Sequence, residues 1–298
     1  MKLLRVGAAG SERPALLDAD GVLRDLSGVV PDIDGALLAD EEALGRVRAA
    51  ADAPGELPVL DGADGAHGAD GADGAELRIG PPLARIGKIV CIGLNYHDHA
   101  RETGAEPPAE PVIFFKAADT VVGPNDTVLV PRGSTKTDWE VELAVVIGRT
   151  ARYLGSAEEA LGHVAGYAVA HDVSEREFQI ERGGTWDKGK NCETFNPLGP
   201  WLVTADEVPD PQDLSLRLWV NGELQQDGTT AEQIFPVGEV VRYVSQFMTL
   251  YPGDVINTGT PAGVAMGRPE PKPYLRAGDV VELEIGGLGR QRQVLRDA

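Results

Sequence analysis

Short apolar runs separated by turn sequences dominate the second half of the chain and predict β-strands. Leu143–Ile147 is continuously apolar, which is typical of a strand buried on both faces. Leu214–Gln226 alternates around Asn221-Gly222, a dipeptide favoured in tight hairpin turns. Val280–Ile285 and Gln291–Leu295 flank a Gly-rich turn in the same way. The pattern therefore predicts a mixed α+β fold that is mainly β, without the long βαβ alternation of a nucleotide-binding sheet.

One segment after residue 236 has helical periodicity instead. Its apolar residues recur at the three- and four-residue spacing of a helix face, and they are Val237, Val240, Val241, Val244, Phe247 and Met248. The sequence thus predicts a helix over 237–248, which Pro252-Gly253 prevents from continuing.

The beginning of the chain predicts a separate small unit. Strands are expected at Lys2–Val6 and Pro14–Leu17, and a helix at Glu41–Ala51, so residues 1–60 form an α+β module. Residues 61–76 are a low-complexity tract of Gly, Ala and Asp with nothing to bury, which predicts a flexible surface insert. The main domain then covers residues 77–298.

Charge restricts the partners of this protein. Lys and Arg number 27 against 47 Asp and Glu, a formal net charge of −20. Such a surface repels nucleic-acid phosphates and anionic membranes, so we expect neither as a partner. No apolar run is long enough to span a bilayer, and the N-terminus is typical of a strand and not of a signal peptide, so we expect a cytoplasmic protein. An anionic substrate would need a local positive charge, for which a bound divalent cation is the obvious candidate.

Three carboxylates suggest where such a cation could bind. Glu140 and Glu142 lie two residues apart at the start of a buried strand, so their side chains project from the same face. Two close carboxylates repel each other and are costly to bury, and a hard divalent cation relieves both penalties. Asp172 ends another apolar run and could complete the site. Alternatively, the two glutamates line an exposed strand face and Asp172 caps a turn. Spacing alone does not decide between these interpretations.

Six motifs in order over about residues 82–290 resemble the signatures of the fumarylacetoacetate hydrolase superfamily. They are Gly93-Leu94-Asn95-Tyr96-His97-Asp98-His99-Ala100, Asp138-Trp139-Glu140-Val141-Glu142-Leu143, Asp172-Val173-Ser174-Glu175-Arg176 with Gln179, Gly189-Lys190, Leu250-Tyr251-Pro252-Gly253-Asp254-Val255-Ile256, and Thr258-Gly259-Thr260-Pro261. The resemblance implies the family's β-sandwich roll, a homodimer, and Mg²⁺ or Mn²⁺ held by Glu140, Glu142 and Asp172, a site that Ca²⁺ could occupy in a crystal.

The resemblance also implies roles for other side chains. His99 and Glu102 lie three residues apart, on one face of a short helix, and resemble the family's water-activating pair on a mobile lid. Lys190 is the candidate for stabilising the oxyanion of a tetrahedral intermediate. The candidates for binding substrate are Lys116, Arg176, Gln179, Gly259 and Thr260.

The expected reaction is hydrolysis of a C–C bond in a 2,4-diketo acid of the acylpyruvate type, giving pyruvate and a carboxylate. The polar segments 132–137 and 179–190 resemble the subgroup that hydrolyses 2,4-diketo-3-deoxy sugar acids such as the fuconate and rhamnonate derivatives. Oxaloacetate decarboxylation and tautomerisation or isomerisation of a 2-oxo acid on the same metal site remain open. A non-catalytic Ca²⁺-binding β protein is disfavoured, because no EF-hand loop is present.

Overall fold

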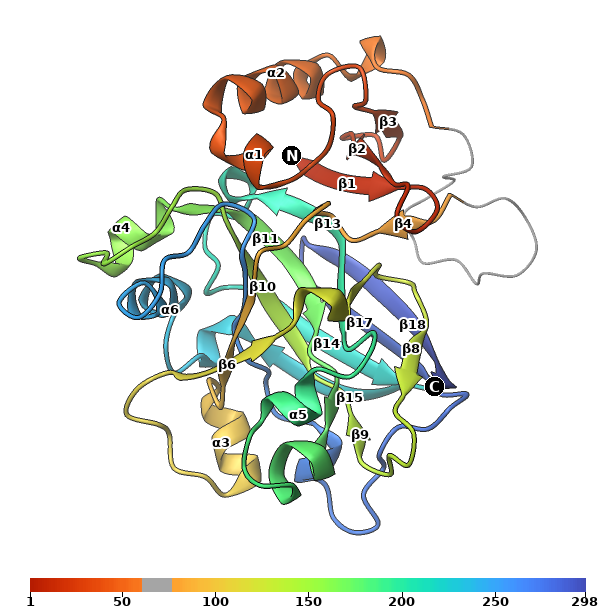
Figure 1. Cartoon of the computed structure of the whole chain (residues 1–298), viewed down its shortest axis with the longest axis vertical. Helices are drawn as coiled ribbons and strands as arrows, with labels where there is room; N and C mark the ends of the chain where they lie inside the picture. The colour runs from red at the N-terminus through yellow and green to blue at the C-terminus, as the bar shows by residue number, and fades with distance from the viewer. Residues whose placement is uncertain (61–76) are drawn as a thin grey trace.

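A computed structural model describes residues 1–60 and 77–298 of this chain (Figure 1). Most of the described strands belong to two sheets. The larger sheet has eleven strands in the order β3-β2-β1-β13-β11-β10-β16-β5-β6, with β4 beside β1 and β7 beside β13, and the smaller sheet has five in the order β15-β14-β17-β18-β8. The predicted mixed, mainly β fold is confirmed.

The elements have the following bounds. The strands of the larger sheet are β1 (Lys2–Val6), β2 (Arg13–Leu17), β3 (Leu23–Asp25), β4 (Ile79–Gly80), β5 (Ile89–Gly93), β6 (Val112–Lys116), β7 (Val121–Val122), β10 (Val141–Ile147), β11 (Val164–His171), β13 (Asn196–Thr204) and β16 (Val255–Asn257). The smaller sheet contains β8 (Val128–Val130), β14 (Ser215–Val220), β15 (Glu223–Thr229), β17 (Val280–Ile285) and β18 (Gly289–Asp297), while β9 (Thr137–Asp138) pairs with β12 (Ser174–Glu175). The α-helices are α1 (Gly35–Ala39), α2 (Glu41–Asp52), α3 (His97–Thr103), α4 (Ala157–Leu161), α5 (Asp187–Lys190) and α6 (Val237–Val244).

Strand β10 explains the continuous apolar run in the sequence. It pairs with β11 on one side and β16 on the other, and all seven of its residues are buried. Its alternate side chains enter two different cores, because successive residues of a strand point to opposite faces. Leu143 and Val145 pack in the core that includes the smaller sheet, whereas Ala144 and Val146 pack in the core that includes α1 and α2. The larger sheet is therefore the middle layer of the protein.

The N-terminal strands extend this middle layer. Strand β1 pairs antiparallel with β13, with Leu3 opposite Leu202, so residues 1–60 and the main part of the chain share one sheet. The strand predicted at 2–6 and the helix predicted from Glu41 are both present. The division into units 1–60 and 77–298 stays a prediction, and the predicted insert at 61–76 lies outside the described residues.

The helix predicted over 237–248 is shorter than its apolar pattern indicates. Helix α6 ends at Val244, where the N–H groups of Gln246 and Phe247 donate to carbonyls three residues earlier instead of four. Phe247 is 63% exposed and packs edge-on against Tyr243, at 4.9 Å between ring centroids, instead of entering the core. The prediction was wrong over the last turn because local hydrogen bonding overrode the apolar spacing.

The N-terminal part lies at one end of the molecule, and α3, α5 and β9 lie at the other (Figure 1). The start of β10 and the end of β11 lie toward this second group, in which α3 and α5 contribute residues to the cavity described below. Among the described residues, no helix is long and apolar enough to cross a membrane.

Candidate active site

Three buried carboxylates meet where β10 begins and β11 ends. Glu140 immediately precedes β10, Glu142 is its second residue, and Asp172 directly follows β11. The N–H of Asp172 donates to the carbonyl of Glu140 at 3.0 Å, which ties the two strand ends together. Each of the three residues offers an oxygen within 4.8 Å of the others. The structure thus brings together the three residues that the sequence predicted as metal ligands.

Three cations surround these carboxylates. Lys190 Nζ lies 2.8 Å from Glu140 Oε2 and 2.9 Å from Asp172 Oδ2, so it bridges the two acids. Lys116 donates to Asp172 Oδ1 and to the carbonyl of Val173. Arg176 Nη2 lies 2.7 Å from Glu140 Oε1. Buried charges are tolerated only when they are paired in this way.

The cations are not shared equally among the carboxylates. Burial alone would raise the pKa of Glu140, but Lys190 and then Arg176 hold it well below its usual value. Burial raises the pKa of Glu142 well above its usual value, and the neighbouring charges of Asp172 and Glu140 raise it further. The donor that meets Glu142 is an uncharged one, the N–H of Gly259, which lies 2.7 Å from Oε2.

This donor set fits a hard divalent cation. Three carboxylates supply the oxygen ligands that Mg²⁺ and Mn²⁺ prefer. Glu142 in particular is a buried acid that forms no salt bridge with the described part of the chain, and a cation placed among the three oxygens would supply the missing charge. The chemistry of the residues therefore agrees with metal binding by Glu140, Glu142 and Asp172.

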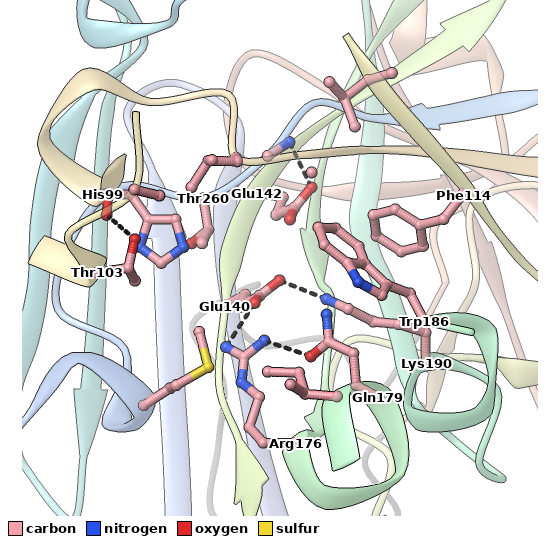
Figure 2. A pocket seen from close by; sticks show the side chains of 17 residues that line it. His99, Thr103, Phe114, Glu140, Glu142, Arg176, Gln179, Trp186, Lys190 and Thr260 are labelled. Atoms are coloured by element: carbon pink, nitrogen blue, oxygen red, sulfur yellow. Dashed lines mark hydrogen bonds and ion pairs between the residues drawn. The ribbon is translucent and has the colours of Figure 1, made fainter. Parts of the chain in front are cut away.

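A cavity of about 200 Å³ opens beside the carboxylates (Figure 2). Of the residues predicted for the site, those that line it are His99, Glu140, Glu142, Arg176, Gln179, Lys190, Gly259 and Thr260. Asp172, Lys116 and Glu102 do not line it. Asp172 and Lys116 have fully buried side chains behind the wall, and Glu102 lies behind His99.

The predicted His–Glu pair lies on α3. His99 Nδ1 is 3.4 Å from Glu102 Oε2, and both oxygens of Glu102 accept the N–H of Gly263 at 3.0 Å. Burial raises the pKa of Glu102, but the hydrogen bonds from His99 and Gly263 outweigh it and leave that pKa lowered. Glu102 is therefore a carboxylate at neutral pH, and it fixes the imidazole while leaving Nε2 for the cavity.

The loop after β16 contributes the part of the wall beside His99 (Figure 2). Gly259 has a φ of +95°, and a Cβ there would lie 2.9 Å from the side chain of Asn95, so only glycine fits. The hydroxyl of Thr260 donates to the carbonyl of Val141 and accepts a hydrogen bond from Gln226, both at 2.8 Å. In this arrangement the hydroxyl already has partners, and it holds the loop against β10.

Sequence reasoning missed Asp138, although it lies in the same motif as Glu140. Its side chain is fully buried, accepts from Arg176 Nε at 2.8 Å, and accepts the N–H groups of Ala265 and Met266. It therefore fixes both Arg176 and the loop that carries Met266. The motif that contains Glu140 and Glu142 drew attention to this segment. The partners of Asp138, however, lie 38 and 127 positions away in the sequence, so its role was not predictable from the motif.

The apolar side of the cavity was also missed. Trp186 and Phe114 pack edge-to-face with ring centroids 5.5 Å apart, and both line the cavity. Gly93 makes room for them, because a Cβ there would lie 2.3 Å from the Trp186 ring. An isolated Gly at the end of an apolar strand is the only hint of this close approach that the sequence contains.

Residues 88–296 match the family model described as fumarylacetoacetate (FAA) hydrolase C-terminal. The chain belongs to the fumarylacetoacetate hydrolase family. A relative from Burkholderia lata named "Putative hydrolase" is 52% identical over 298 residues, covering 100% of both chains. The resemblance seen in the motifs is thus confirmed at the level of the family, whereas the sugar-acid subgroup is not.

Solved structures agree with the fold and differ in activity. The fumarylacetoacetate hydrolase of Exiguobacterium antarcticum is 32% identical with a TM-score of 0.82, covering 100% of both chains, which confirms the family-type fold. A maleylpyruvate hydrolase from Sphingobium sp. SYK-6, in complex with manganese(II) ion and pyruvate, is 28% identical with a TM-score of 0.77 and full coverage of both chains. A 5-carboxymethyl-2-hydroxymuconate delta-isomerase from Mycobacterium smegmatis is 30% identical with a TM-score of 0.74, covering 100% of this chain and 99% of that one. The structural neighbours of this chain therefore include both hydrolases and isomerases.

Proposed function

We propose that this protein is a divalent-metal-dependent hydrolase that cleaves a C–C bond in a 2,4-diketo acid and releases pyruvate and a carboxylate. The observation that carries the proposal is the position of the His99–Glu102 pair across one cavity from the carboxylates Glu140 and Glu142, with Asp172 behind them. Two solved relatives are named as hydrolases, and the structure of one of them contains manganese and pyruvate.

Glu140, Glu142 and Asp172 would hold the metal, Mg²⁺ or Mn²⁺. When bound, a divalent cation polarises the oxygens of a chelating 2-oxo acid and offsets the charge that builds up on the enolate. Glu140 and Glu142 line the cavity and would also place this end of the substrate, while Asp172 lies behind the wall.

His99 would act as the general base. Its Nδ1 faces Glu102, so Nε2 can take a proton from a water molecule that attacks the C4 carbonyl. The new C–O bond forms as the carbonyl pair moves onto oxygen. When the carbonyl re-forms, the C3–C4 bond breaks, its electron pair goes to C3, and the imidazolium returns the proton there. The products are pyruvate and the carboxylate derived from C4.

Lys190 would stabilise the oxyanion. Its ammonium has three N–H groups, of which two are directed at Glu140 and Asp172, so one is available for a substrate oxygen. Burial lowers its pKa, but the charges of Asp172 and Glu140 outweigh burial and leave that pKa raised, which favours the charged ammonium. Arg176 and Gln179 line the same wall and are bonded to each other at 3.0 Å, so we assign them to substrate positioning along with the loop of Gly259 and Thr260. Lys116 would support Asp172 from behind the wall.

A substrate panel tests the reaction class. Purified protein would be assayed with Mg²⁺ and with Mn²⁺ on acylpyruvates, 2,4-diketo-3-deoxy sugar acids, oxaloacetate and an unsaturated 2-oxo dicarboxylate. We expect pyruvate together with a carboxylate from the diketo acids. An isomerase is the second candidate because one structural neighbour is named as a delta-isomerase, and such an enzyme would rearrange the unsaturated acid without releasing pyruvate. Pyruvate and CO₂ from oxaloacetate alone would instead indicate a decarboxylase.

A further inference from the structure

A second cavity, here called the outer cavity, adjoins the one that contains the carboxylates. Its volume is about 470 Å³. Arg176, Ile180 and Met266 line both cavities, so the two share one wall. The two cavities are therefore neighbours, and a long substrate anchored at Glu140 and Glu142 would enter the outer cavity past these three residues.

More cations than carboxylates line the outer cavity. Three cations that the inner cavity lacks line it, Lys136, Lys272 and Arg276, against the two carboxylates Glu181 and Glu270. This excess of positive charge occurs on a protein whose formal net charge is −20. A local reversal of sign next to a substrate cavity favours anionic ligands and raises their local concentration.

Two of these cations have no carboxylate partner among the described residues. Lys136 is paired with Glu181. In the described part of the chain, however, no salt bridge joins Lys272 or Arg276 to an acid. Lys272 Nζ donates to the carbonyls of Met266 and Arg268, and Arg276 Nη1 donates to that of Leu275 at 2.8 Å. Glu270 accepts the backbone N–H of Lys272, and its charge opposes an incoming anion.

We propose that Lys272 and Arg276 in the outer cavity bind a second carboxylate at the far end of the substrate, so that the enzyme prefers dianionic over monoanionic 2-oxo acids. Tyr274 lines the same wall and offers a phenolic O–H that can donate to the same group. Both cations belong to the segment that leads into β17, and both line the outer cavity. The inference rests on the proposed function only in taking a 2-oxo acid as the inner anchor.

The test compares two ligands that differ only in the terminal carboxylate. 2-Oxoheptanedioate and 2-oxoheptanoate lack the second oxo group, so they cannot undergo the proposed hydrolysis, and titration calorimetry on the Mn²⁺-loaded full-length protein measures binding alone. We expect the dianion to bind about 3- to 10-fold more tightly, as for one or two partly exposed ion pairs. Added salt should reduce the ratio.

Variants assign the preference to the named cations. The double variant Lys272→Met, Arg276→Met should bind both ligands equally, while Arg276→Lys should retain most of the preference because it keeps the charge. Arg46→Met is the matched control, since it removes a cation from the distant helix α2, and it should leave the ratio unchanged. Equal binding of the two ligands by the wild type, or an undiminished ratio in the double variant, would overturn the inference.

A parallel assay separates this inference from the proposed function. The kcat/KM values for 2,4-dioxoheptanedioate and 2,4-dioxoheptanoate should differ by the same ratio as the binding constants. If neither compound is cleaved while the dianion still binds more tightly through Lys272 and Arg276, the hydrolase proposal fails and the outer carboxylate site stands. If both are cleaved at equal kcat/KM and bind equally, the hydrolase stands and the outer site fails.

Discussion

At the scale of single residues, the site consists of buried carboxylates and buried cations that neutralise each other. The carboxylates were predictable because they lie in short motifs at the ends of apolar strands. The pairing of these carboxylates with cations was not predictable, because Lys116 and Asp172 are 56 positions apart, and Lys190 and Glu140 are 50 apart. Which lysine neutralises which acid depends on the antiparallel pairing of β10 with β11, and sequence spacing does not specify that pairing.

Removing one carboxylate should abolish metal binding. Glu142→Gln replaces an oxygen ligand by an amide and also removes a buried acid whose charged form is disfavoured by burial and by its acidic neighbours, so the metal-free variant should fold at least as well as wild type. Asp172→Asn should lose metal as well, but it leaves Lys116 and Lys190 short of a counter-charge and should lower the melting temperature. Titration calorimetry with Mn²⁺ measures affinity, and thermal unfolding without metal measures stability. Wild-type affinity in both variants would show that the ligands lie elsewhere.

Removing the proposed general base should lower kcat and leave the affinity for Mn²⁺ unchanged. His99→Ala should lower kcat by about 10²–10⁴, the usual range for losing a general base. Glu102→Gln should cost less if Glu102 only orients the imidazole. Steady-state pyruvate release gives kcat, and Mn²⁺ titration of the same samples checks the metal site. A confirmed diketo acid hydrolysed by both variants at near wild-type rate would rule out this pair as the base.

At the scale of elements, the alternation of apolar and polar residues predicted strands such as β17, because a strand buried on one face has a period of two residues. The helix at 237 was predicted at its start but not at its end, since the last turn is decided by hydrogen bonds around Ser245 that no periodicity reveals. Helix α3 illustrates the same limit. Its existence follows from the motif, whereas its packing against the loop 263–267 through Glu102 is visible only in the structure.

The contact between Glu102 and the loop 263–267 can be tested by substitution at Gly267. A Cβ on Gly267 would lie 2.4 Å from the carboxyl carbon of Glu102, so Gly267→Ala should displace Glu102 from Gly263 and loosen its hold on His99. We expect kcat to fall by roughly tenfold with metal affinity preserved, a loss of about 1.4 kcal/mol in transition-state stabilisation. Gly45→Ala is the control, because that position on α2 has open space around it and should be neutral or slightly stabilising. An unchanged kcat in Gly267→Ala would mean that the position of Glu102 on this loop does not matter.

At the scale of the whole molecule, the N-terminal strands and the main part of the chain form one sheet and are also joined by ion pairs. Arg78 donates to Asp126 at 2.6 and 2.8 Å and to Glu12 at 2.7 Å, so it links β4 to the segment before β2 and to the loop before β8. The sequence predicted a separate module because residues 61–76 interrupt the pattern. It could not show that β1 pairs with β13, a contact about 200 positions away.

This network makes stability sensitive to acid. Burial would raise the pKa of Glu12, but the hydrogen bond from Arg78 and the charge of Arg5 leave that pKa lowered. A folded-state pKa below the unfolded value stabilises the protein above about pH 4.5, and the contribution is lost as the pH falls through the folded-state pKa. Arg78→Met should therefore lower the free energy of unfolding at pH 7 by about 1–3 kcal/mol. The deficit relative to wild type should shrink below pH 4.5.

Urea unfolding at a series of pH values measures this difference. Arg46→Met serves as the control, because its pair with Glu42 is exposed and should contribute at most about 1 kcal/mol. A deficit for Arg78→Met that stays the same from pH 7 to pH 3 would show that the ion pairs do not carry the effect.

Product analysis of a 2,4-diketo acid incubated with the wild-type protein and with Glu142→Gln tests the proposed metal-dependent hydrolysis most directly. Magnetic resonance spectra would follow substrate, pyruvate and the second carboxylate together, with Mn²⁺ or Mg²⁺ supplied and then removed by a chelator. We expect pyruvate and the carboxylate in equal amounts, only with metal and only from the wild type. Equal product formation by Glu142→Gln, or by chelated wild-type protein, would contradict it.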